Sequence, residues 1–325
     1  MCFYFCSNLD LTMVTLKDIA SAHERIRPFV HRTTVMTNNS LDELSGAKLF
    51  FKCDNFQKAG SFKIRGATNT VELLSQEELD KGVATTSSGN HGAALSMAVK
   101  RRGGKTKVVM PINTPKIKVN NVERNGGEVV WCEPDQPSRE RVLNELVIET
   151  GSTVVHPYND ERIVAGQGTA AKELLEDHPD LDMIICPVSG GGLLSGTLLS
   201  AKGINPHIKV FGAEPSEADD AYRSLQKGEI VANKTIDTIC DGLRAQIGSI
   251  TFPIIQEHVD GIITVTELEI IEAMKMVWER MKIIAEPSSV ITLGALLKNQ
   301  KLFSGKKVGL ILSGGNVDLN ELPWI

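Results

Sequence analysis

The sequence has no long apolar run and no excess of basic residues. No stretch approaches the ~20 consecutive apolar residues that a membrane-spanning helix needs. The formal net charge is -5, so a nucleic acid would find no general electrostatic attraction on this chain. We therefore expect neither a membrane nor a nucleic acid among its partners.

Regularly spaced cysteines are also absent. The six cysteines show no paired spacing of the kind that holds a metal ion. Several of them stand inside apolar runs, where small buried thiols are common. This usage is typical of a reducing compartment, and we expect a cytoplasmic protein.

Short apolar runs alternate with helix-length segments over most of the 325 residues. The predicted strands cover residues 48–53, 83–86, 107–110, 128–132, 153–156, 183–188, 208–213, 262–265 and 308–312. The predicted helices between them include residues 91–102, 138–150, 168–176 and 268–282. Such alternation predicts an α/β fold, with parallel sheets covered by helices on both faces.

Lys63 lies in the segment GSFKIRGA at residues 60–67. Its neighbours Ser61, Phe62 and Ile64 are small or apolar, so its ammonium form would be poorly solvated if the segment is buried. Desolvation lowers the pKa of a lysine and favours the nucleophilic amine that forms an imine with an aldehyde. The alternative is an ordinary surface lysine at the start of a helix.

A glycine-rich turn follows the predicted strand at residues 183–188. Its sequence is SGGG at residues 189–192, and the next helix is expected to start near Leu193. Glycines allow backbone N–H groups to converge on an anion, and a helix N-terminus adds partial positive charge. The turn therefore predicts a phosphate-binding site.

A dinucleotide-binding loop is the alternative interpretation of this turn. Glu214 ends the next predicted strand, at about the distance expected of an acid that binds a ribose. The spacing of Gly190, Gly192 and Gly196, however, departs from the G-x-G-x-x-G pattern. This alternative also leaves Lys63 without a role.

Two further segments place polar side chains directly after predicted strands. Ser313 opens SGGN at residues 313–316, where a hydroxyl could bond a ring nitrogen or simply cap the turn. In SSGNHG at residues 87–92, Ser87, Ser88 and Asn90 are good helix N-caps, and exposed amides there would suit a substrate carboxylate. His91 is more simply interpreted as a packing residue.

Clustered carboxylates follow another strand, in EPSEADD at residues 214–220. Hard oxygen ligands of this kind suit Mg2+ or Ca2+. An acidic loop that is only solvated is the alternative on spacing alone.

Together, these segments resemble the threonine dehydratase and serine racemase branch of the fold-type II pyridoxal-phosphate enzymes, over about residues 16–316. The resemblance is strongest to the serine racemases. It implies two open, twisted parallel-sheet domains with the active site in the cleft between them. Residues 1–75 and 160–325 would form the large cofactor-binding domain, and residues 76–159 a small mobile domain. It also implies a homodimer that acts on a small amino acid.

The resemblance implies that Lys63 forms an imine with pyridoxal 5'-phosphate (PLP), that Asn90 bonds the cofactor's ring oxygen, and that Ser313 bonds its ring nitrogen. A serine partner there favours elimination and proton exchange over transamination. The full set of implied cofactor-binding residues is Phe62, Lys63, Asn90, Gly190, Gly191, Gly192, Leu193 and Ser313.

Ser88 bears on the reaction itself. Serine racemases carry serine at this position, whereas alanine is common in relatives that only dehydrate. Inversion at Cα requires an acid–base group on each face, and Lys63 and Ser88 would supply them. We therefore expect racemisation of L-serine to D-serine, accompanied by β-elimination to pyruvate and ammonia. The alternatives are a threonine or 3-hydroxyaspartate dehydratase with weak racemase activity, and a catalytically silent binding protein.

The resemblance also implies accessory ligands. A divalent ion (Mg2+ or Ca2+, with Mn2+ as a further choice) would bind the Glu214 carboxylate, the Ala218 carbonyl and the Asp220 carboxylate. ATP is a candidate allosteric activator. Ala59 departs from the family here, since vertebrate serine racemases have threonine at this position, in a region tied to nucleotide activation.

Overall fold

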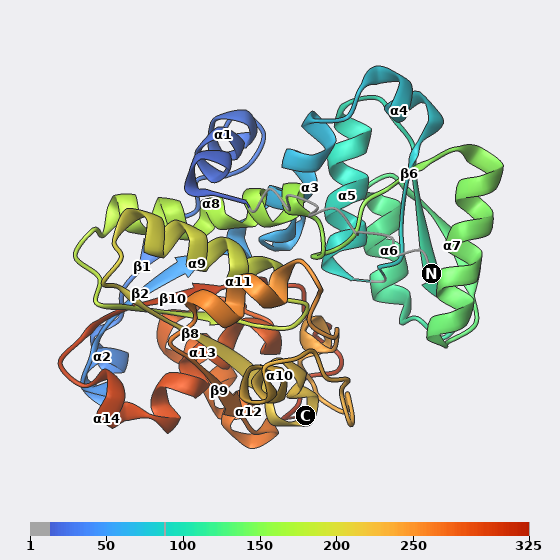
Figure 1. The fold of residues 1–325 in the computed structure, drawn as a ribbon. Coiled ribbons are helices and arrows are strands. Elements are labelled where there is room, and N and C mark those ends of the chain that lie inside the picture. Colours follow the sequence, from blue (N-terminus) through green and yellow to red (C-terminus); the bar gives the residue numbers. More distant parts are fainter. Residues whose placement is uncertain (1–13, 88, 325) are drawn as a thin grey trace, which may run out of the picture.

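The computed structural model describes residues 14–87 and 89–324 and contains two β-sheets in that part of the chain (Figure 1). The first sheet has the strand order β1 (Val35–Met36), β2 (Lys48–Cys53), β10 (Lys307–Leu312), β7 (Met183–Pro187), β8 (Lys209–Pro215) and β9 (Gly261–Val265). The second has the order β5 (Gly127–Cys132), β4 (Thr106–Pro111), β3 (Val83–Thr85) and β6 (Thr153–Val154). All neighbouring strands are parallel except β1, which is antiparallel to β2.

Helices connect most of these strands. They are α1 (Leu16–Ile26), α2 (Asn39–Ser45), α3 (Lys63–Glu72), α4 (Gln76–Lys81), α5 (Asn90–Arg101), α6 (Lys116–Arg124), α7 (Gln136–Thr150), α8 (Glu161–Asp177), α9 (Gly192–Ile204), α10 (Asp220–Lys227), α11 (Thr251–His258), α12 (Glu267–Met276), α13 (Pro287–Lys298) and α14 (Gln300–Phe303). Within the residues described, none of them is long and apolar enough to cross a membrane.

The first sheet is buried on both faces because its strands alternate between two cores. Leu49 and Phe51 of β2 belong to the core that includes residues of α12 and α13, whereas Phe50 packs against the core that includes residues of α8 and α9. Leu310 and Ile311 of β10 divide in the same way. Figure 1 shows α8 and α9 over one face and α13 and α12 over the other. Strands buried on both sides are continuous apolar runs, which is why the sequence revealed them.

Each of the nine predicted strands corresponds to a strand of the structure, and the predicted α/β fold is confirmed. The two-residue strand β1 was missed because it is too short to show a pattern. The predicted start of α8 at residue 168 was wrong, since Asp160 caps this helix and it begins at Glu161. Predicted helix 268–282 ends as an α-helix at Met276 and continues as a π-helical turn, Val277–Met281.

Glycines in α8 and α3 bring the two helix backbones together. A Cβ atom on Gly166 would lie 2.6 Å from the Cα of Gly66, and one on Gly66 would lie 2.6 Å from Nε2 of Gln167. Any larger residue would force the helices apart, because 2.6 Å is far inside van der Waals contact. Since α3 starts at Lys63, this close packing fixes where Lys63 lies.

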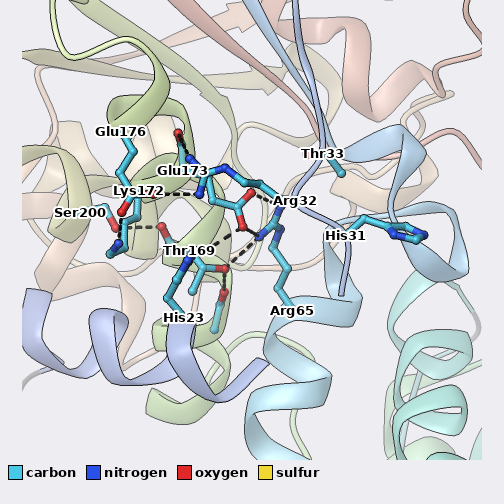
Figure 2. A network of polar contacts seen from close by, with 12 residues as sticks. His23, His31, Arg32, Thr33, Arg65, Thr169, Lys172, Glu173, Glu176 and Ser200 are labelled. Atoms are coloured by element: carbon cyan, nitrogen blue, oxygen red, sulfur yellow. Dashed lines mark hydrogen bonds and ion pairs between the residues drawn. The ribbon is translucent and has the colours of Figure 1, made fainter. Parts of the chain in front are cut away.

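A buried ionic network also holds α3 (Figure 2). Arg65, which is 0% exposed, donates through Nε and Nη2 to Asp54 at 2.6 and 2.9 Å. It donates through Nη1 and Nη2 to Glu173 of α8, both at 2.8 Å. Lys52 of β2 also donates to Glu173, at 2.7 Å. The network thus ties the first turn of α3 to β2 and α8.

Candidate active site

A cleft of about 1600 Å³ is lined by residues at the ends of strands from both sheets. Its walls include residues that directly follow β3, β7 and β10, as expected where the carboxyl ends of parallel strands meet. Every described residue that the sequence assigned to the cofactor lines this cleft: Phe62, Lys63, Asn90, Gly190, Gly191, Gly192, Leu193 and Ser313. The fold therefore gathers four segments that are distant in the sequence.

Lys63 is the first residue of α3 and is partly buried in the cleft wall. Its Nζ donates to the backbone oxygen of Pro157 at 2.9 Å and lies 5.1 Å from the ring centroid of Phe62. Burial lowers the pKa of Lys63 to about 8, although the Glu286 carboxylate acts in the opposite direction. Near neutral pH the neutral, nucleophilic amine is therefore far more populated than in an ordinary lysine, although the ammonium form still predominates.

The glycine turn forms the N-terminus of α9. Its N-cap is Gly191, which has a left-handed φ of 92° and no side chain to cap the helix. A Cβ atom on Gly190 would lie 2.4 Å from the ring of Tyr158, so this position has room only for glycine. Thr251 fixes the turn by donating to the Gly190 oxygen at 2.7 Å. The uncapped N–H groups of a 13-residue helix thus face the cleft, as an anion-binding site requires.

The N-terminus of α5 is a second uncapped helix end at the cleft. Its N-cap is Gly89, not Ser87 or Asn90, and among the described residues no side chain caps its first N–H groups. Both Ser87 and Asn90 line the cleft. Ser88 lies outside the described residues, and its role remains a prediction. The two helix ends offer separate places for two anionic groups.

Ser313 is buried and held beside the lysine segment. Its backbone oxygen accepts from the N–H of Phe62 at 2.9 Å, and Ser61 and Gly314 form an isolated antiparallel bridge. The Ser313 side chain is only 3% exposed. These contacts place the Ser313 hydroxyl and Lys63 in one pocket.

Sequence reasoning missed Glu286, a buried carboxylate in the same cleft. Asn90 Nδ2 donates to its two oxygens at 3.0 and 3.2 Å, and the N–H of Asn316 donates to Oε2 at 3.2 Å. Burial, together with the nearby Asp241 carboxylate, raises the pKa of Glu286 to about 8. Nothing in the sequence marks this residue, since an acid before Pro287 looks like an ordinary helix start.

His91 is a packing residue, as its sequence context suggested. It is 1% exposed, and its Nε2 lies 3.3 Å from the backbone oxygen of Val155. Burial lowers its pKa to about 3, so the ring is neutral at physiological pH. A neutral buried imidazole with one backbone partner has no evident role in proton transfer.

The predicted metal ligands lie behind the glycine turn, outside the cleft lining. Glu214 accepts from the N–H groups of Ala221 and Tyr222, and Asp220 Oδ2 accepts from Ile247 N–H at 2.7 Å. Burial raises the pKa of both carboxyls, that of Asp220 to about 6.

These carboxyls fit a divalent cation. Oδ1 of Asp220 is buried without a hydrogen-bond partner, and a cation would satisfy it and neutralise both acids. In the part of the chain described, no group of three or more His, Cys, Asp or Glu side chains gathers as a metal site. A cation here would therefore depend on the Ala218 carbonyl and water for its remaining ligands.

The α/β fold places a partly buried lysine and two uncapped helix ends in one cleft. The chain belongs to the pyridoxal-phosphate dependent enzymes, since the model of that family matches residues 26–314. It is 52% identical to the serine racemase of Dictyostelium discoideum over 321 residues, which cover 97% of this chain and 98% of that relative. It is 48% identical to the β-hydroxyaspartate dehydratase of Paracoccus denitrificans over 310 residues, 95% of this chain and 98% of that relative.

The solved structure of maize serine racemase has a TM-score of 0.93 and 46% identity, with 95% of each chain covered. The predicted family and the fold-type II architecture are therefore confirmed.

Proposed function

We propose that the protein is a PLP-dependent serine racemase that also eliminates water from serine to give pyruvate and ammonia. The observation that carries the proposal is the presence of Lys63 and two uncapped helix ends in one cleft. One end suits the cofactor's phosphate and the other the substrate's carboxylate. Similarity to serine racemases along almost the whole chain supports the choice of substrate.

Each residue then has a defined task. The turn at residues 190–192 binds the phosphate, Ser313 bonds the ring nitrogen, and the α5 N-terminus orients the substrate carboxylate. PLP, when bound, supplies the electron sink that makes the Cα proton of serine acidic. Lys63 Nζ removes this proton from one face, and the Ser88 hydroxyl returns a proton to the other. Elimination starts with the same proton removal, so both activities are expected in one protein.

A dehydratase that acts on threonine or 3-hydroxyaspartate is the second candidate. The relative from Paracoccus denitrificans carries such a name, and its identity to this chain is similar to that of the serine racemases. Arg124 and Arg139 add positive charge to the cleft wall, which would favour a substrate with a second carboxylate.

The proposal includes accessory features. A divalent cation at Glu214, Ala218 and Asp220 would stabilise the segment behind the glycine turn. In that segment the N–H of Ile247 donates to Asp220, and the N–H of the next residue, Gly248, donates to the Gly190 oxygen.

Residues 76–159 form the small mobile domain, and residues 1–75 and 160–325 the large one. The strands of the second sheet, which fall between residues 83 and 154, support this division. The proposal further includes a homodimer, a cytoplasmic location and activation by ATP, which rest on the family resemblance.

The test is incubation of purified protein with L-serine, Mg2+ and PLP, followed by chiral chromatography for D-serine and a parallel assay for pyruvate. D-serine together with pyruvate is the expected result. Pyruvate alone would move the function to a dehydratase. Borohydride should trap the cofactor on Lys63, and Lys63→Ala should abolish trapping. Lys48→Ala, at an exposed lysine, is the matched control. A protein without cofactor absorbance would contradict the whole proposal.

A further inference from the structure

Glu286 is the buried acid of the cleft that the proposed reaction does not use. It is 3% exposed and lies at the N-cap of α13. Its side chain does not cap that helix. The carboxylate is instead directed at the two segments expected to contact the cofactor ring, which suggests a role in the site.

The first of these segments begins with Asn90. Its Nδ2 donates to both carboxylate oxygens of Glu286, while its Oδ1 accepts from Asn316 Nδ2 at 2.8 Å. Both oxygens of the Glu286 carboxyl accept from this amide nitrogen, so the carboxyl fixes which end of the Asn90 amide faces it. Because a single N–H can bond both oxygens in a bifurcated contact, the second N–H of Asn90 can donate to a ring oxygen in the cleft.

The second segment is the turn after Ser313. The N–H of Glu286 donates to the Gly314 oxygen at 3.0 Å, and the N–H of Asn316 donates to the Glu286 side chain. A Cβ atom on Gly314 would lie 2.7 Å from Oε1 of Glu286, so the carboxylate packs directly on this turn. Glu286 therefore contacts the segments of both residues expected at the pyridine ring.

Charges around Glu286 keep this carboxyl near its ionisation point. Burial and Asp241 favour its neutral form, whereas Lys118 and the N–H groups of Asn90 and Asn316 favour the ionised form. Lys118 and Asp241 themselves form an ion pair at 2.6 Å.

We propose that Glu286 is a positioning residue that orients the Asn90 amide toward the cofactor's ring oxygen and joins it to the Ser313 turn. The inference rests on the proposed function only in requiring that PLP binds in this cleft. Glu286 does not touch the reacting atoms. It acts through Asn90, and removal of either residue should have the same effect.

A double-mutant cycle tests this with the full-length holoenzyme. The readouts are the dissociation constant of PLP and the position of its visible absorbance band, which reports hydrogen bonding at the ring oxygen. Glu286→Ala and Asn90→Ala should each weaken PLP binding roughly fivefold, the value of about one hydrogen bond. Because they act through one contact, the double variant should also be about fivefold weaker, with the same band shift. In Glu286→Gln the new amide can both donate and accept, so it can bond either end of the Asn90 amide. This variant should therefore give a partial effect.

Additive losses of about 25-fold in the double variant would overturn the inference, as would an unchanged absorbance band in Glu286→Ala. Glu269→Gln is the matched control, since that carboxylate accepts from the Thr266 N–H at 2.8 Å and neither residue lines the cleft. If Glu286→Ala does not fold, Glu286→Gln carries the same comparison with Asn90→Ala. Wild-type protein without lysine-linked PLP would instead defeat the proposed function. Normal wild-type binding with no effect at Glu286 defeats this inference alone.

Discussion

Replacing Arg65 with methionine should destabilise the protein by about 3–5 kcal/mol, the usual cost of removing one partner from a buried ion pair. Methionine keeps most of the side-chain volume and removes the charge and the donors. The network balances Arg65 and Lys52 against Asp54 and Glu173, so the variant would leave one buried negative charge uncompensated. At about 2 °C per kcal/mol for a chain of this size, the melting temperature should fall by roughly 6–10 °C.

Thermal unfolding followed by circular dichroism measures this change, and Arg32→Met is the matched control. Arg32 pairs with Glu176 and Asp177 at the edge of the same network, but it is 45% exposed (Figure 2). Its loss should cost less than about 1 kcal/mol. Adding Glu173→Gln to Arg65→Met should recover part of the stability by restoring neutrality. Equal, small effects of Arg65→Met and Arg32→Met would refute the reasoning.

The pH dependence of Arg65→Met provides a second check. Although burial opposes it, Arg65 and Lys52 lower the pKa of Glu173 to about 2, below the ordinary value of 4.5. A lowered pKa adds stability above pH 4.5, and that stability is lost as the pH falls toward 2. The difference between wild type and variant should therefore shrink over this range. A difference that stays constant from pH 6 to pH 3 would contradict the assignment.

Four further predictions concern the site and the segments that support it. Ser88→Ala should lower D-serine formation by about 10²-fold or more while pyruvate formation largely survives; a parallel loss of both products would make Ser88 structural. If a cation binds beside Asp220, Mg2+ should raise the melting temperature of the wild type and Asp220→Asn should abolish that rise; an undiminished rise would place the cation elsewhere. Ala59→Gly should stabilise the protein by about 0.5–1 kcal/mol, because Ala59 has a left-handed φ of 58°, whereas Ala67→Gly inside α3 should destabilise it by about 1 kcal/mol. Reattachment of PLP to Lys63 in cofactor-free protein should accelerate as the pH rises toward about 8 and then level off, as measured by visible absorbance; a rate independent of pH would argue against a proton on this amine.

The parts of the site that follow a strand directly were predictable from sequence. Gly190 and Ser313 each come just after a buried apolar run, and parallel strands bring their carboxyl ends to one edge. The pairing of Asn90 with Glu286 was not predictable, since 196 residues separate them. Each residue alone matches a common helix-start pattern, and only the fold makes them partners.

Lys52 and Lys63 show that the local sequence does not reveal which lysine is paired with a carboxylate. Lys52 is more buried than Lys63, yet its neighbours in KLFFKC did not distinguish it from an ordinary strand residue. Its partner Glu173 lies 121 residues away and holds it in an ion pair, and Lys52 does not line the cleft. Within residues 14–87 and 89–324, Lys63 has no carboxylate at ion-pair distance and donates only to a backbone oxygen. Burial lowers the pKa of Lys63, and because no carboxylate among the described residues pairs with its amine, we expect Lys63 to be the reactive amine of the cleft.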